Sequence, residues 1–200
     1  MSKYLMTQSL LNSWLYVYKA HEDYSEAAYG EFLQTLNKIS KPPNEAMLAG
    51  INFEDAVNAV TAGKIDPAAV TDSVRRVAEI VQGGQPQVAL YRNKTIAGID
   101  FLLYGRLDYL KAGTVYDIKF SKNYEVGKFY ESIQRPFYFG ICPEALWFEY
   151  LISDGRDVFS ERYGRSDDSN ALERTITEFM EFLRSRNLLH IYFDKWQSKS

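Results

Sequence analysis

The chain has 200 residues and a net charge of −3, with 46% hydrophobic and 24% charged residues. This composition predicts an ordinary globular protein and excludes a strongly basic protein that coats nucleic acid over its whole surface. The single cysteine, Cys142, excludes an internal disulfide and any four-cysteine zinc or iron–sulfur site within one chain.

The first 84 residues are expected to form helices. Hydrophobic spacing and breaker residues predict helical segments at residues 4–19, 24–38, 44–50, 53–60 and 66–81. Ser9 or Ser13 is expected to cap or bend the first segment, and Asn44 to cap the third. Pro67 is expected in the first turn of the last segment. Residues 82–86 (QGGQP) then end the helical pattern.

Residues 85–165 are expected to form a sheet interrupted by one helix. The predicted strands are residues 87–92, 95–109, 114–120, 145–153 and 157–163, and the predicted helix is residues 125–140. Turns are expected at residues 93–94, 111–113, 154–155 and 166–170. Helices at residues 170–186 and 188–197 follow.

This order of elements predicts an α/β fold with a mixed central sheet flanked by helices. We expect one domain over residues 1–200, with a helical region at 1–84, a sheet core at 85–165 and C-terminal helices at 166–200. The N-terminus lacks a basic segment followed by an apolar core, and the longest apolar stretches are too short to span a bilayer. We therefore expect a cytoplasmic protein with no membrane partner.

Two neighbouring predicted strands carry unusual charges. Asp108 follows an apolar run and Gly105, and nine residues later Asp117 is followed by Lys119. Side chains alternate along a strand, so Asp117 and Lys119 would share a face with Val115. Buried charges need partners or a metal, and hard oxygen ligands suit Mg²⁺ or Mn²⁺. Two acids and a lysine at the end of a sheet can hold a divalent cation and act on a phosphodiester.

Each charged or polar motif also has a simpler structural explanation. Arg106 and Asp108 alternate to one face and fit an exposed ion pair on an edge strand. Gln134 and Tyr138 lie one turn apart on the predicted helix, which fits a surface amide and a core tyrosine. Glu54 fits an ordinary helical turn with an exposed acid. Taken one by one, these motifs do not establish a site.

Taken together, the motifs resemble the PD-(D/E)XK nuclease superfamily, in particular its RecB-like exonuclease branch of phage and CRISPR-associated enzymes. The family pattern is glycine-x-x-x-acid, glycine-x-x-aspartate, aspartate-x-lysine and glutamine-x-x-x-tyrosine, in that order. The matching residues are Gly50 and Glu54, Gly105 and Asp108, Asp117 and Lys119, and Gln134 and Tyr138. Many members carry histidine where this chain has Glu54, and the iron–sulfur members need four cysteines where it has one. The resemblance covers residues 5–140.

The resemblance implies a restriction-endonuclease-like core and a metal-dependent nuclease. The implied ligands of Mg²⁺ or Mn²⁺ are Glu54, Asp108, Asp117 and the carbonyl of Ile118. Lys119 would orient or deprotonate the attacking water and stabilise the transition state. Gln134 would orient that water or a phosphate, and Tyr138 would brace its helix or touch the nucleic-acid backbone.

Basic and aromatic residues near the motifs are candidates for substrate binding. Lysines neutralise phosphates, and aromatic rings stack on bases. The candidates are Arg106, Lys122, Tyr124 and Lys128. Packing in the core explains the neighbouring Phe129 and Tyr130 equally well.

The favoured function is hydrolysis of DNA by an exonuclease in phage or mobile-element recombination or repair. A recombination or repair protein, or further copies of the chain, would be its partners besides DNA. One alternative is a nuclease fold that binds DNA or a partner protein without cleaving it. Another is an α/β interaction protein in which the motifs occur by chance. In that last case, Glu54, Asp108, Asp117 and Lys119 would be dispersed in the structure.

Overall fold

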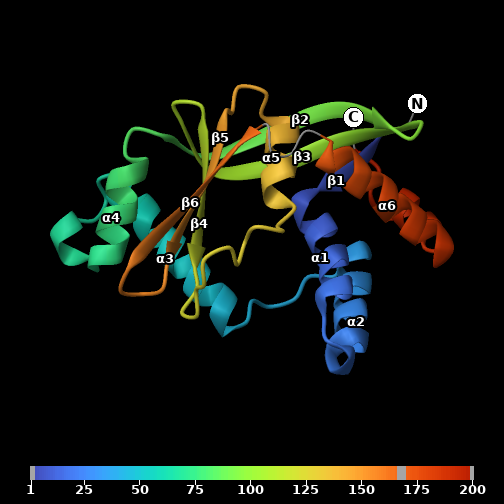
Figure 1. Cartoon of the computed structure of the whole chain (residues 1–200), viewed down its shortest axis with the longest axis horizontal. Helices are drawn as coiled ribbons and strands as arrows, with labels where there is room; N and C mark the ends of the chain where they lie inside the picture. The colour runs from blue at the N-terminus through green and yellow to red at the C-terminus, as the bar shows by residue number, and fades with distance from the viewer. Residues whose placement is uncertain (1–2, 166–169, 199–200) are drawn as a thin grey trace.

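The computed structural model describes residues 3–165 and 170–198, apart from the side chain of Asp23. Within these residues, six strands form one mixed sheet with helices on both faces (Figure 1). The predicted fold class, α/β with a mixed central sheet flanked by helices, is confirmed. No helix of the described chain is long and apolar enough to cross a membrane.

The long strand at residues 99–111 is the centre of the sheet. The strands are β1 (Tyr4–Thr7), β2 (Gln85–Ile96), β3 (Ile99–Lys111), β4 (Thr114–Phe120), β5 (Trp147–Ser153) and β6 (Val158–Gly164). β2 pairs antiparallel with β3 along one edge, and β1 (parallel) and β4 (antiparallel) share the other edge. β4 pairs in parallel with β5, which pairs antiparallel with β6.

One edge of β3 has a gap between its two partners on that side. β1 pairs with residues 101–104 and β4 with residues 109–111, while β2 occupies the opposite edge. Residues 105–108, which are the glycine-x-x-aspartate motif, therefore face no strand of the described chain there. We call this interval the sheet gap. Backbone groups in such a gap need other partners, and the carbonyl of Arg106 accepts a hydrogen bond of 3.0 Å from the hydroxyl of Tyr138.

Helices pack on the two faces of the sheet and bury two hydrophobic cores. The helices are α1 (Gln8–Lys19), α2 (Ser25–Leu36), α3 (Glu45–Thr61), α4 (Asp72–Val81), α5 (Gln134–Ile141), α6 (Ala171–Ser185) and α7 (Leu189–Lys195). The larger core lies under α1, α2, α5, α6 and α7, and the smaller one under α3 and α4 (Figure 1). Val115 of β4 lies in the larger core and Ile118 in the smaller one. The predicted alternation of β4 side chains is therefore correct.

The prediction of one helix over residues 4–19 is wrong at its start. Tyr4–Thr7 is β1, and α1 begins at Gln8 because the Thr7 hydroxyl caps it by accepting the N–H of Leu10 at 3.2 Å. Neither Ser9 nor Ser13 is the cap. Met6 points into the core and is fully buried, so packing against β3 prevails over the helical spacing of this segment.

Two further helices differ from the expected segments. α3 is continuous from Glu45 to Thr61, and Asn44 caps it as predicted, through the N–H of Met47 at 2.9 Å. The expected helix at residues 66–81 is instead a short 3₁₀ turn, Pro67–Ala69, followed by α4. Thr71 caps α4 by accepting the N–H of Val74 and so starts a new helix there.

The first hairpin turn lies four residues beyond its predicted place at 93–94. Ala97 and Gly98 both have positive φ, 50° and 77°, as a two-residue turn between β2 and β3 requires. The predicted turns at 111–113 and 154–155 agree with the structure. The last two helices also agree, as α6 and α7, with shorter bounds. The turn predicted at 166–170 lies outside the described residues except for Asn170.

The helix predicted at residues 125–140 is limited to α5, Gln134–Ile141. The preceding residues, 121–133, form turns. Glu161 on β6 holds this loop, because its Oε1 accepts the N–H of Gly127 at 2.6 Å and the hydroxyl of Tyr124 at 2.5 Å. Gly127 has a φ of 84°, which is not helical.

Close packing of α5 on β3 leaves no room for a side chain at Gly105. A Cβ there would lie 2.7 Å from Cδ1 of Ile141 and 2.8 Å from Cε1 of Tyr138. We expect Gly105→Ala to lower the free energy of unfolding by about 1–3 kcal/mol, the usual cost of overpacking. The control is Gly50→Ala, which meets no described atom within 4 Å and should gain about 0.5–1 kcal/mol in a helix interior. Urea unfolding measures both; equal stability of Gly105→Ala and the wild type would contradict the close packing.

Candidate active site

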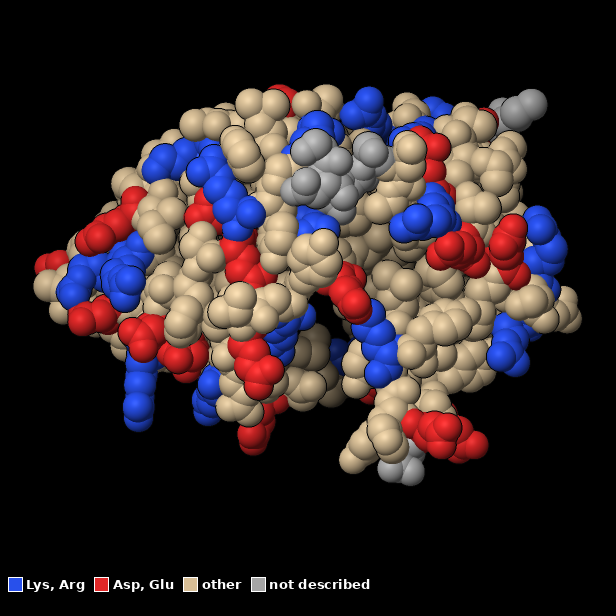
Figure 2. Space-filling view, in the orientation of Figure 1, with Lys and Arg blue, Asp and Glu red and all other residues tan. Residues whose placement is uncertain are grey.

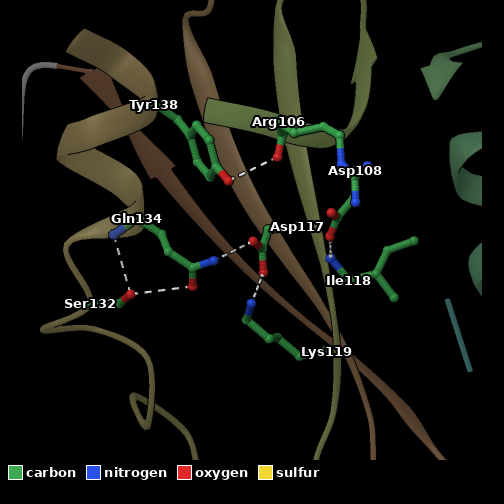
Figure 3. A network of polar contacts seen from close by, with 8 residues as sticks. All are labelled: Arg106, Asp108, Asp117, Ile118, Lys119, Ser132, Gln134 and Tyr138. Atoms are coloured by element: carbon green, nitrogen blue, oxygen red, sulfur yellow. Dashed lines mark hydrogen bonds and ion pairs between the residues drawn. The ribbon is translucent and has the colours of Figure 1, made fainter. Parts of the chain in front are cut away.

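The two aspartates of the motifs meet where β3 and β4 separate beside the sheet gap. The last paired residues towards the gap are Tyr109 and Tyr116, and continuing this register by one residue places Asp108 opposite Asp117. Oδ2 of Asp108 accepts the backbone N–H of Ile118 at 2.7 Å (Figure 3). The side chain of Asp108 thus occupies a position that the next backbone hydrogen bond of the ladder would otherwise take.

Asp117 is the most deeply buried acid of the site, with 4% of its surface exposed. Its Oδ1 accepts a hydrogen bond of 2.7 Å from Nε2 of Gln134, and its Oδ2 lies 2.5 Å from Nζ of Lys119 in an ion pair (Figure 3). Apart from this ion pair, Oδ2 has no hydrogen-bond partner within the described chain. Burial raises the pKa of Asp117, although Lys119 and Gln134 oppose the shift.

The start of α5 orients the amide of Gln134. The Ser132 hydroxyl accepts the backbone N–H of Gln134 and donates to its Oε1, both at 3.3 Å. The amide nitrogen is thereby directed at Asp117. One turn later, the hydroxyl of Tyr138 donates to β3 at the sheet gap, so the two ends of the motif hold α5 on β4 and β3. Pro136 is the third residue of α5, in the first turn, where its missing N–H leaves no bond unmade.

Glu54 approaches the aspartates from α3 and is partly buried. Its Oε1 accepts a hydrogen bond of 2.5 Å from Nε2 of Gln87 on β2. Burial raises the pKa of Glu54, Gln87 opposes this shift, and the charge of Asp117 adds to it. The pKa of Asp108 is raised well above its ordinary value by burial and then by the charges of Asp117 and Glu54. The three acids therefore lie close enough to repel one another.

A hydroxyl from β3 fixes the position of α3 on the sheet. The hydroxyl of Tyr109, next to Asp108, donates to Oδ1 of Asn58 at 2.6 Å and lies 2.7 Å from the hydroxyl of Thr61. Asn58 is one helical turn after Glu54. The ring of Tyr109 is buried in the smaller core. This contact sets which turn of α3 faces the aspartates.

Two of the predicted substrate-binding residues, Arg106 and Lys122, are exposed. Arg106 lies at the sheet gap, and its positive charge lowers the pKa of Glu54, so it acts on the acids from nearby. Lys122 is exposed in the loop that follows β4. Both side chains are exposed to solvent, and their role in binding substrate stays a prediction.

The other two predicted substrate-binding residues are bound to the loop itself. Tyr124 donates its hydroxyl to Glu161, and its ring packs against Phe159 with centroids 4.8 Å apart. Nζ of Lys128 donates to the hydroxyl of Ser121 at 2.8 Å and to a backbone carbonyl at 2.9 Å. Binding of substrate by these two residues stays a prediction, and the contacts shown here stabilise the loop.

The carboxylates of the site suit a hard cation, although they are not arranged around a common metal position. Within residues 3–165 and 170–198, no group of three Asp, Glu, His or Cys side chains is arranged to hold a metal ion. Each of the three acids accepts a hydrogen bond from a protein donor instead. Carboxylate oxygens are the ligands that Mg²⁺ prefers, and Oδ2 of Asp117 is held in the described chain by the ion pair with Lys119. A divalent cation would relieve the repulsion between the acids, so the chemistry of these residues suits the implied metal, and its binding stays a prediction.

Sequence reasoning missed two residues of the site, Gln87 and Ser132. Gln87 stands among exposed polar residues at the start of a strand, and its place opposite Asp108 follows only from the β2–β3 register. Ser132 lies in a segment expected to be helical. Neither residue belongs to a motif with a spacing that would have singled it out.

Comparisons with known proteins support the fold. No family model matches the chain, and no curated protein does. Among solved structures, the crystal structure of SSO0001 is 13% identical with a TM-score of 0.51, over 88% of this chain and 77% of that one. The structure of LHK-Exo in complex with dAMP is 18% identical, over 92% of this chain and 94% of that one, with a TM-score of 0.40. The first likeness shows a shared fold alone, and the second TM-score is too low to carry an argument.

Proposed function

We propose that this protein is a Mg²⁺- or Mn²⁺-dependent nuclease that hydrolyses the phosphodiester bonds of DNA. The observation that supports it most is the meeting of charged residues at the sheet gap. Glu54 comes from α3, Asp108 from β3, and Asp117 with Lys119 from β4. Chance motifs in an interaction protein would leave these charges dispersed, and nothing in the fold requires three acids that repel one another.

The chemistry follows from the groups at the site. A bound metal ion supplies activation of water and neutralises charge on the phosphate. The three acids would hold it, and the carbonyl of Ile118 is the further ligand that the family resemblance implies. Lys119 orients the attacking water and stabilises negative charge on the phosphate, because its ammonium group lies at the edge of the acid cluster. Gln134 fixes the carboxylate of Asp117 through its hydrogen bond.

The direct test is a cleavage assay with purified protein in Mn²⁺ or Mg²⁺. Single- and double-stranded DNA is supplied in end-labelled linear and in circular form. We expect the linear substrates to be degraded and EDTA to stop the reaction, and an exonuclease would leave the circles intact. Failure to cleave any of these substrates would contradict the proposed function.

A nuclease fold that binds DNA or a partner protein without cleaving it is the second candidate. It is favoured by one observation, that each acid is occupied by a protein donor. A metal titration followed by thermal unfolding separates the two. Binding to the folded state alone contributes about 2.7 kcal/mol at a hundredfold excess over Kd, or roughly 5–10 °C in Tm for a chain of this size. A Tm that does not respond to either ion would favour the non-catalytic candidate.

The biological setting rests on the family resemblance alone. We propose exonuclease action in recombination or repair of a phage or mobile element, in the cytoplasm. Acidic and basic side chains are interspersed over the face in Figure 2, and the net charge is −3. We therefore propose that a partner protein or further copies of the chain supply positive charge that neutralises the phosphates of DNA. The single nuclease domain over residues 1–200 also stays a prediction.

A further inference from the structure

Gln87 has an unusual backbone conformation for a residue within a strand. Its φ is 52°, in the left-handed region that residues with a Cβ rarely adopt. Its neighbours Pro86 and Val88 pair with Tyr109 and Leu107, so Gln87 stands opposite Asp108. Strained backbone that persists in a folded protein is concentrated at functional sites. Here the strain coincides with the one position of β2 that faces a site acid.

The side chain of Gln87 extends to α3 and binds the third acid. Its Nε2 donates to Oε1 of Glu54 at 2.5 Å, in a partly buried contact between β2 and α3. Without this contact, the carboxylate of Glu54 could move, because three rotatable bonds separate it from the backbone. Because a carboxylate has two oxygens, the contact fixes one of them and leaves Oε2 for another ligand. The amide therefore restricts where the carboxylate can lie relative to Asp108.

We propose that Gln87 is a positioning residue that holds the Glu54 carboxylate beside Asp108 for metal binding. This role rests on the proposed function, since it needs the acids to bind a metal ion. Residues that hold a metal ligand in place typically change metal affinity by 10–100-fold when they are removed. The strained, left-handed backbone at Gln87 directs its amide towards Glu54 on α3.

The variant Gln87→Gly tests this role, because it deletes the amide and also relieves the backbone. Glycine adopts positive φ without steric cost, so the variant should be at least as stable as the wild type without metal. We expect it to need about tenfold more Mn²⁺ for half of the metal-induced rise in Tm. The matched control is Ala97→Gly at the far end of the same hairpin, where φ is 50°. It offers the same backbone relief and should leave the Mn²⁺ requirement unchanged.

A crystal structure of metal-free Gln87→Gly gives a readout independent of metal, in which the Glu54 carboxylate should leave its wild-type position. An unchanged carboxylate, or an unchanged Mn²⁺ requirement, would overturn the role of Gln87 and leave the proposed nuclease intact. Lower stability without metal would show that the amide acts as an ordinary structural contact, which also overturns the role. A wild type whose Tm does not respond to Mn²⁺ would overturn the proposed function, and this role with it.

Discussion

Asp117→Asn and Lys119→Ala are each expected to lower the rate of metal-dependent DNA cleavage by about 10²–10³-fold or more. Asparagine keeps the shape of Asp117 and an oxygen that can accept the amide of Gln134, but it removes the negative charge that a cation needs. Lys119→Ala removes the ammonium group that lies 2.5 Å from Asp117. Neither change creates a cavity in a hydrophobic core, so both proteins should fold.

The two variants should differ in how they respond to metal. Asp117→Asn should lose the rise in Tm with Mn²⁺, because a ligand is gone. Lys119→Ala should keep that rise, because its loss frees Oδ2 of Asp117 and removes a competing positive charge. Single-turnover cleavage of end-labelled DNA and thermal unfolding measure the two effects. The control is Asp100→Asn, the same chemical change at a carboxylate that accepts the Thr95 hydroxyl near the far end of the hairpin. Cleavage at the wild-type rate by both variants would refute the assigned roles.

Regular patterns allowed the sheet core to be predicted from the sequence. Residues 114–120 alternate between two hydrophobic environments, and the structure places Val115 and Ile118 in the two separate cores. By contrast, Tyr4–Thr7 is too short a strand to show alternation, and it forms only because β3 offers a free edge next to the sheet gap. The loop at 121–133 depends on Glu161, which lies 37 and 34 residues after the two loop residues that it binds, Tyr124 and Gly127, and no local pattern could reveal this.

The residues of the candidate site that belong to motifs could be predicted from the sequence. A residue that reaches the site only through the register of strand pairing could not. The spacing of Asp117 and Lys119 on one strand places them on one face, and the structure pairs them. Gln134 and Tyr138 lie one helical turn apart, and both contact the sheet as that spacing allows. Gln87 is different, because its contact with the site requires the pairing of β2 with β3 and a positive φ at position 87. Neither can be predicted from the sequence pattern.

Asp108→Asn is expected to stabilise the metal-free protein at neutral pH by about 0.5–2 kcal/mol, as substitutions of strained functional groups often do. The pKa of Asp108 is raised well above the ordinary value of 3.8 by burial and by the charges of Asp117 and Glu54. The folded protein thus retains a proton that the unfolded chain releases. Wild-type stability therefore falls as the pH rises from the ordinary carboxyl range towards the folded-state pKa. Asparagine removes this penalty and can still accept the N–H of Ile118.

The pH dependence of the gain distinguishes a charge effect, from burial of the Asp108 carboxylate and from its acidic neighbours, from a simple packing effect. The gain from Asp108→Asn should shrink as the pH falls to about 4, because the wild-type carboxyl is then largely protonated in the folded protein and increasingly protonated in the unfolded chain. Asp154→Asn is the control, since the N–H groups of Arg156 and Asp157 lower the pKa of Asp154, and it should bring no gain at neutral pH. Urea unfolding between about pH 4 and 8 measures both. With saturating Mn²⁺ the order of stability should reverse, because only the wild type keeps the full set of acids. A gain that is independent of pH would mean that neither burial nor the neighbouring acids destabilise the Asp108 carboxylate, and would remove a main reason for placing a cation among the acids.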